Sequence, residues 1–235
     1  MNKFNIPALI IALGIAVLGL CIYSSTRAYI NANHHVTVRG LSQRTVKSDD
    51  AYYTIHCGFD GDNAQVLYQQ LTAENQVVVA YLREKGFKEE DITITSPSTN
   101  DNTGNYNYKP GVTKHYTVSN SVVLHTSDVD AVEQLTHSEG ELIERGLYVT
   151  TDAAFFFNGL NDIKPEMIEE ATKNARATAE KFAQDSGSKI GKIQSATQGQ
   201  FAIFTNSQES DYSFDDARYK MKNVRVVTTV VYELR

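Results

Sequence analysis

Cysteine is scarce in this chain of 235 residues, which contains only Cys21 and Cys57. Cys21 lies inside an apolar segment and Cys57 in an expected strand, so we expect no disulfide between them. Cys57 has no evident activating neighbour, and a small buried hydrophobe is therefore its simplest interpretation. A redox-sensing thiol at Cys57 is the alternative.

Basic residues are also in deficit, with 22 Lys and Arg against 28 Asp and Glu and a net charge of -6. Binding to nucleic acid requires a basic patch, so we expect no nucleic-acid partner. The common catalytic signatures are missing too: there is no phosphate loop, nucleophile elbow, H-E-x-x-H or C-x-x-C. The sequence therefore favours a protein that is not an enzyme.

The histidines do not form an evident metal site. His34 and His35 are adjacent, so on a strand they point to opposite faces. His115 and His125 flank one expected strand and are too far apart along it to share a metal ion. The acidic segment Asp60–Asn63 lacks the later Gly and Glu of a calcium loop, and a solvated turn is its simpler interpretation. We expect no catalytic, cofactor-binding or metal-ligating residues and no cofactor.

One long apolar segment, Ile6–Tyr23, carries no charge and is long enough to cross a bilayer as a helix. Lys3 precedes it and Arg27 is the first charge after it, which places the N-terminus in the cytoplasm. We expect residues 1–30 to contain a single-pass anchor in the cytoplasmic membrane. The body, residues 31–235, is then expected on the periplasmic or extracellular side.

Two other interpretations of this segment remain open. A cleaved signal peptide would end in a small-x-small site, which residues 20–28 lack. A lipoprotein would be modified at Cys21, but the residue before it, Leu20, is large where a small residue is required. Both observations favour an uncleaved anchor.

The body alternates between strand and helix patterns. The helix at 64–85 has an amphipathic repeat and a turn at Asp60–Asn63 that can cap it, and Gly86 ends it. Strands are expected at 35–40, 51–59, 91–95, 116–125, 147–157, 195–204 and 223–234, and helices at 64–85, 127–145 and 165–187. Two polar segments, 100–111 and 205–216, are expected loops. This order predicts an α+β fold in which a mixed, mainly antiparallel sheet packs with three helices.

The third helix has a distinctive inner face. Pro165 is expected to open it, because a proline at the first position loses no hydrogen bond. Small residues dominate the stripe that would face the sheet, so the helix can lie close to the strands. The stripe consists of Ile168, Ala171, Ala175, Ala179 and Phe182.

Aromatic residues suggest one alternative function. The run Phe155–Phe157 is typical of a strand buried on both faces. Tyr106 and Tyr108, in the loop 100–111, can fold back on the domain or form a partner-binding tip. A pocket near these tyrosines and Phe155–Phe157 would make the body a small-molecule-binding or enzymatic domain.

Several short motifs resemble one known family, the bacterial SIMPL-domain proteins, over 36–235. They include Val36-x-Val38-x-Gly40, Tyr116-x-Val118-x-Asn120 and a helical segment that begins Ala171-x-x-x-Ala175-Arg176-Ala177-x-Ala179-Glu180. The chain departs from the family pattern at Ser48, where the family has proline, and at Ser42, where a second glycine is common.

The resemblance implies an exported envelope protein with an α+β fold. Some family members form large ring-like or channel-like oligomers, and some are linked to defence against oxidative stress. The family offers no established catalytic residues, so we expect Arg176 and Glu180 to form an i,i+4 ion pair. We therefore predict a membrane-anchored envelope protein that forms a homo-oligomer or binds a protein partner through exposed strand edges.

Overall fold

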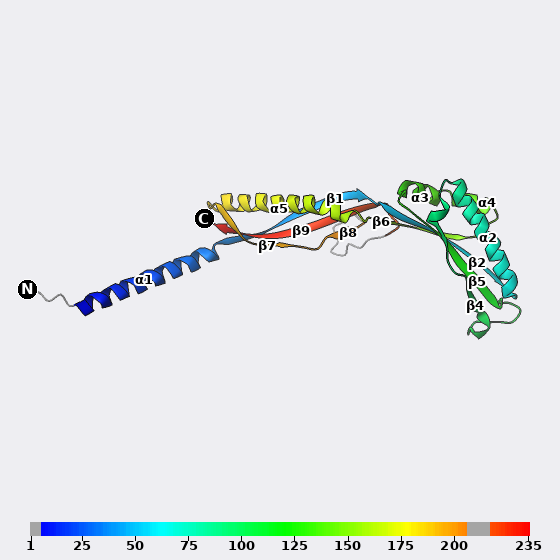
Figure 1. Cartoon of the computed structure of the whole chain (residues 1–235), viewed down its shortest axis with the longest axis horizontal. Helices are drawn as coiled ribbons and strands as arrows, with labels where there is room; N and C mark the ends of the chain where they lie inside the picture. The colour runs from blue at the N-terminus through cyan, green and yellow to red at the C-terminus, as the bar shows by residue number, and fades with distance from the viewer. Residues whose placement is uncertain (1–5, 206–216) are drawn as a thin grey trace, which may run out of the picture. The chain divides into compact units, whose positions relative to one another are not determined.

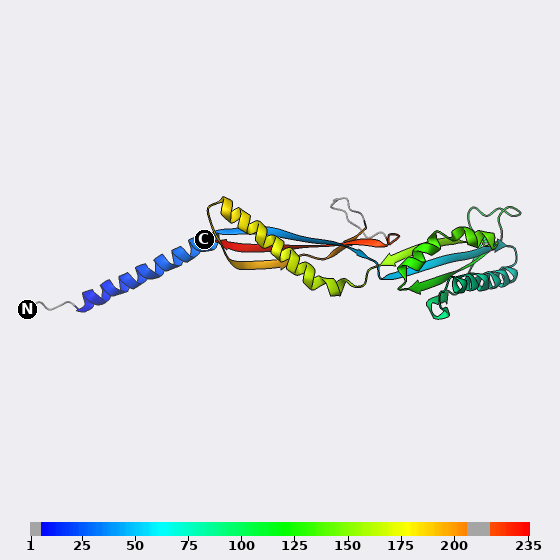
Figure 2. The ribbon, with the colours of Figure 1, turned by 90° about the horizontal axis from the view of Figure 1, so that it is seen from above.

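The computed structural model describes residues 6–205 and 217–235, and within the first helix it describes the side chains of residues 10–26. The predicted loop at 205–216 therefore lies almost wholly outside the described residues. The chain forms two compact units (Figures 1 and 2). Unit 1 comprises residues 1–43, 164–201 and 225–235, and unit 2 comprises residues 44–163 and 202–224.

Helix α1 (Ile6–Asn33) contains the predicted anchor. Its apolar side chains are exposed, with Ile15 at 68% and Leu20 at 67% of their full accessible area. Among the described residues, no helix combines the length and the apolar character required of a membrane span. The anchor at 6–23 therefore stays a prediction.

Unit 2 is built on a sheet whose strands follow the order β3-β5-β2-β6, with β4 paired to β5. All of its pairs are antiparallel. The strands are β2 (Asp50–Gly61), β3 (Ile92–Ile94), β4 (Ser98–Asp101), β5 (Tyr116–Thr126) and β6 (Thr150–Phe156). Alternate residues of β2, from Ala51 to Cys57, are buried in the core. The sheet therefore has one core face and one open face.

Three helices cover the core face: α2 (Ala64–Glu84), α3 (Val129–Thr136) and α4 (Glu139–Glu144) (Figure 1). Asn63 caps α2, because its side chain accepts hydrogen bonds from the N–H groups of Gln65 and Val66. Gly86 has a φ of +97° just after the helix end, as predicted for a glycine stop. The amphipathic helix and both of its end signals are therefore confirmed.

Unit 1 contains most of a second sheet, in the order β1-β9-β7, with β8 paired to β9. Its strands are β1 (His35–Lys47), β7 (Ile190–Gln198), β8 (Ala202–Phe204) and β9 (Met221–Leu234). β7 pairs antiparallel with β9. Helix α5 (Leu160–Asp185) lies along one face of this sheet (Figure 2). The mixed α+β class with antiparallel sheets is thus confirmed.

Glycine at position 40 allows α5 to approach β1 closely. A Cβ atom at Gly40 would lie 1.8 Å from the carbonyl oxygen of Ala171 and 2.5 Å from the backbone nitrogen of Ala175. Because both contacts are to helix backbone, no side-chain rearrangement could make room for a larger residue. The glycine of the Val-x-Val-x-Gly motif is therefore a packing residue.

The inner stripe of α5 differs in part from the prediction. The alanines at 171, 175 and 179 are buried, but Phe182 is 57% exposed. Met167 and Ala183 are buried in place of Ile168 and Phe182, because a spacing of four residues keeps them on the same face. The prediction of Phe182 as an inner residue was wrong.

Two helix predictions also need correction. The helix predicted at 127–145 is divided into α3 and α4, because Ser138 has a φ of -107° and a ψ of 13°. The body therefore has four helices among its described residues. Pro165 does not open α5, which begins at Leu160 and contains Pro165 within it. Pro165 therefore lies in the second turn of the helix, where it cannot donate the usual backbone hydrogen bond to the carbonyl oxygen four residues earlier.

Two strand predictions and one loop prediction were wrong in extent or burial. The strand predicted at 195–204 is interrupted: β7 begins at Ile190 and ends at Gln198, and β8 follows. The strand with the phenylalanine run is not buried on both faces, because β6 is an edge strand and Phe156 is 37% exposed. The predicted loop 100–111 begins with the end of β4 and a single 3-10 turn, Asn102–Gly104.

Candidate functional site

The open face of the unit 2 sheet brings polar side chains from three strands together. Residues at alternate positions point away from the helices, so β2 contributes Tyr52 and His56 to this face. His56 lies opposite Ser121 of β5 and Thr150 of β6. The strand register therefore determines which polar side chains are neighbours on this face. No short motif in the sequence indicates that they meet.

His56 is held between two polar neighbours. Its Nδ1 lies 2.9 Å from Ser121 Oγ, and its Nε2 lies 3.2 Å from Asp152 Oδ2. The His56 side chain is 48% exposed and that of Asp152 is 72% exposed. Ser121, His56 and Asp152 thus form a row across β5, β2 and β6.

These residue types also occur in serine hydrolases, but the surroundings do not suit acyl transfer. In such enzymes a buried aspartate orients the histidine, and free backbone N–H groups stabilise the oxyanion. Asp152 is exposed, and the Ser121 N–H already donates to Thr95 Oγ1 at 2.8 Å. The row is better suited to holding a ligand than to activating a nucleophile.

An open cavity of about 500 Å³ lies beside His56, and we call it the His56 groove. Small hydroxyl side chains dominate its lining, and Tyr148, which is 86% exposed, also contributes. The lining contains no Asp, Glu, Lys or Arg; its side chains with hydroxyl groups other than Tyr148 are Thr95, Ser96, Ser98, Ser119, Ser121 and Thr150. The groove is therefore polar, and none of its lining residues is an acid, a lysine or an arginine.

Aromatic contacts stabilise the same face toward the other end of β2. The rings of Tyr52 and His125 stack at 4.3 Å between centroids, and Phe156 meets Tyr52 edge-on at 5.8 Å. His125 Nε2 lies 2.7 Å from Asp50 Oδ1. This stack occupies the aromatic side chains with each other, so it leaves them little surface for a ligand.

The pocket predicted near Tyr106, Tyr108 and Phe155–Phe157 does not form. Phe156 pairs with Asp50 at one end of β2, whereas the loop that carries the tyrosines leads to Tyr116, which pairs with Gly61 at the other end. At roughly 3.3 Å per residue, these ends are about 36 Å apart. Tyr108 packs near the His115 ring, at 5.7 Å between centroids, while Tyr106 is fully exposed. The prediction that the tyrosines share a pocket with this strand was therefore wrong, whereas Thr150 at the other end of β6 does line the cavity beside His56.

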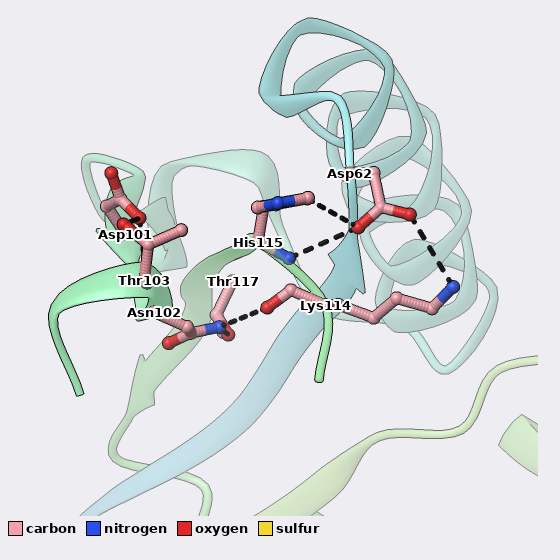
Figure 3. A network of polar contacts seen from close by, with 7 residues as sticks. All are labelled: Asp62, Asp101, Asn102, Thr103, Lys114, His115 and Thr117. Carbon is pink, nitrogen blue, oxygen red and sulfur yellow. Dashed lines mark hydrogen bonds and ion pairs between the residues drawn. The ribbon is translucent and has the colours of Figure 1, made fainter. Parts of the chain in front are cut away.

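A polar network near Gly61 holds the loop in place (Figure 3). Asp62 Oδ1 accepts a hydrogen bond from the His115 backbone N–H at 3.2 Å and lies 2.9 Å from the ring Nδ1. These bonds lower the pKa of Asp62. Asn102 donates to the Lys114 carbonyl oxygen at 3.1 Å. The carboxylate of Asp62 therefore serves to fix the loop. The turn predicted at Asp60–Asn63 is shorter than expected, because Asp60 and Gly61 belong to β2 and the chain bends at Asp62.

Cys57 is buried, with 2% of its area exposed. Burial raises the pKa of its thiol to about 12, with a further contribution from the nearby charge of Glu74. The interpretation as a small buried hydrophobe is confirmed. The redox-sensing alternative is disfavoured, because the thiolate is the reactive form.

The Cys57 environment predicts resistance to alkylation. Relative to an ordinary thiol with a pKa near 8.5, the thiolate population at pH 8 should be lower by a factor on the order of 1000. Iodoacetamide should therefore leave Cys57 unmodified in the folded chain and modify it in urea, as read by mass spectrometry of the Cys57 peptide. Rapid labelling of folded Cys57 would contradict this.

The expected pair of Arg176 and Glu180 is confirmed as structural. Arg176 Nε lies 2.9 Å from Glu180 Oε1 on the exposed face of α5. The helical segment around it thus combines a buried alanine stripe with a solvated ion pair. Both features serve the packing and solubility of α5.

Comparison with known proteins adds a family but no activity. A search of curated proteins found no match. The sequence model of the SIMPL family, described as "Protein of unknown function (DUF541)", matches residues 36–232. The matched span includes Gly40 and the alanine stripe that packs against it. The chain therefore belongs to the SIMPL family.

Proposed function

We propose that this protein is a membrane-anchored, exported envelope protein that is not an enzyme and acts by self-association. The observation that carries the proposal is the outer edge of β7. Among the described residues, β7 pairs only with β9 on its inner side, and its residues from Lys192 to Gln198 are exposed. An exposed edge offers unpaired N–H and C=O groups to another strand.

The second half of β7 has few features that protect such an edge. Charges, prolines and bulges commonly prevent strand addition. The pairing of β7 with β9 is irregular up to Ser195 and regular from Ser195 to Gln198. Those four residues carry no charge and no proline. They are therefore suited to accept a strand from another copy of the chain.

β1 is the opposite edge strand of the same sheet. If β1 of one copy pairs with β7 of the next, the contact is head-to-tail, and its repetition can close into a ring. The family resemblance implies a role in envelope or oxidative stress. Because Cys57 is buried, this role would depend on the assembly and not on chemistry of that thiol.

The exposed apolar surface of α1 supports the anchoring part of the proposal. Ile11, Leu13 and Leu18 are each more than 60% exposed and have no protein cover. Apolar side chains around a whole helix require an apolar environment. The charges at Lys3 and Arg27 favour the body on the periplasmic or extracellular side.

The mass of the native protein extracted with detergent tests both parts. We expect a defined multiple of the 26.1 kDa chain with residues 1–30 still attached. Native mass spectrometry, followed by the intact mass of the denatured chain, would measure both quantities. A chain cut after Cys21 would contradict the anchor, and a monomer at all concentrations would contradict self-association.

Substitution at the β7 edge tests the surface itself. Thr197 is exposed and pairs with Thr229 of β9. Thr197→Lys should weaken assembly at least tenfold, because a charge at the edge opposes strand addition. Thr72→Lys, the same change on the exposed face of α2, should leave assembly unchanged. Equal masses for both variants would exclude β7 as the assembly surface.

A further inference from the structure

Part of the lining of the His56 groove forms no hydrogen bonds within the described chain. The side-chain hydroxyls of Ser96, Ser98, Ser119 and Thr150 form no hydrogen bond with any described residue. Each hydroxyl can donate one hydrogen bond and accept two. Several free donors and acceptors therefore converge on one cavity.

The absence of acidic and basic side chains in the lining restricts the charge that a ligand can carry. No Asp, Glu, Lys or Arg lines the groove, and the neighbouring Asp152 is turned toward His56 Nε2 at 3.2 Å. An ionised ligand would lose hydration on entry without gaining an opposite charge. A neutral ligand with many hydroxyl groups would instead exchange its hydrogen bonds with water for bonds to the lining.

Tyr148 supplies an aromatic surface to the same cavity. It lies between α4 and β6, lines the groove and is 86% exposed. A single exposed tyrosine is common on a protein surface, but this ring lies against a cavity that is lined with free hydroxyl groups. Sugar rings have apolar C–H faces that stack on aromatic rings, with hydroxyl groups around their edges.

We propose that the His56 groove binds a neutral sugar unit of a glycan. Tyr148 stacks on the sugar ring, while the hydroxyl groups of Ser98, Ser119 and Thr150 bond those of the sugar. The volume of about 500 Å³ lies within the range of small-molecule sites, roughly 300–1,000 Å³. The groove is open, so a longer glycan can extend beyond it along the sheet.

Binding can be measured with the full chain in a zwitterionic detergent that has no sugar headgroup. The probes are two neutral disaccharides, maltose and N,N′-diacetylchitobiose, and two charged sugars, glucuronate and glucosamine. Saturation-transfer NMR and calorimetry should detect at least one neutral disaccharide and weaker or no binding of the charged sugars. Binding of neither neutral disaccharide would overturn the proposal.

Three variants test the assignment of the site. Tyr148→Ala should weaken binding more than tenfold, and Thr150→Val, which keeps the side-chain shape, about three- to tenfold. Tyr106→Ala removes another exposed tyrosine outside the groove and should leave binding unchanged. Unchanged binding by Tyr148→Ala, with circular dichroism like that of the parent, would overturn the proposal.

The native mass of each variant separates this proposal from self-association. Tyr148 lies in unit 2 and the β7 edge in unit 1, so Tyr148→Ala should keep the parent's oligomeric mass. A monomer that binds the disaccharide would contradict self-association alone. An oligomer that binds neither neutral disaccharide would contradict the sugar site alone.

Discussion

Replacing Gly40 with alanine should lower the free energy of unfolding by about 3 kcal/mol, near the upper end of typical overpacking costs. The added Cβ would lie 1.8 Å from Ala171 O and 2.5 Å from Ala175 N. Both atoms belong to the backbone of α5, so the whole helix must move away from β1. That movement would expose the small apolar cluster that includes Val38 and Ala179.

Urea unfolding followed by circular dichroism would measure the change. Gly140→Ala is the matched control, because Gly140 lies within α4 and a Cβ there meets nothing within 4 Å. Alanine has the higher helix propensity, so this control should stabilise the protein by about 0.5–1 kcal/mol. Similar effects of the two substitutions would show that α5 does not approach β1 as closely as described.

Leu71→Ala should destabilise the protein by about 2–5 kcal/mol, the typical cost of a large-to-small change in a core. Leu71 is fully buried on the inner face of α2, within the cluster that includes Ile55 and Val122. The truncation would leave a cavity that the surrounding helices and sheet can fill only in part.

Val77→Ala on the same helix is the control, since Val77 is 40% exposed. Its loss of apolar contact is small, and alanine favours the helix, so stability should change by less than about 0.5 kcal/mol. Both variants are read from the midpoint of urea unfolding. A Leu71→Ala effect no larger than that of Val77→Ala would contradict the assignment of Leu71 to the core.

Local patterns were sufficient to predict much of the secondary structure. The stripe of Leu67, Leu71, Val78 and Leu82 is buried as its spacing predicts, with Asn63 and Gly86 at the two ends of the helix. Such signals depend on neighbours within one or two turns. Where a local signal was ambiguous, as at Pro165 and Ser138, the predicted boundary was wrong.

The His56 groove could not be predicted in the same way. His56 is 65 residues from Ser121 and 96 from Asp152, and strand pairing alone brings them together. A polar alternation is visible in β5 at Ser119 and Ser121, but it indicates only a solvated face. The register between β2, β5 and β6 is needed to show that these polar positions are neighbours.

The wrongly predicted aromatic pocket illustrates the same limit. Tyr108 and Phe156 are both aromatic and both near expected strands, but β2 separates them by its full length. Composition identifies residues that can line a pocket, whereas topology determines which of them meet. The family motifs, in turn, correspond at Gly40 and Ala171 to packing and carry no information about a ligand.

The alanine stripe of α5 has a consequence for how the helix is positioned along β1. Alanines recur every four residues from 171 to 183, so a slide of four residues, about 6 Å at 1.5 Å per residue, would bring most of them to the position of another alanine. Two polar contacts distinguish the positions: Ser42 Oγ donates to Glu170 Oε2, and Asn174 Nδ2 donates to the Leu41 carbonyl oxygen, both at 2.8 Å. A slide would break both bonds without improving the apolar contact. These two hydrogen bonds, one of them from the serine that departs from the family glycine, therefore select one sliding position among several of similar packing.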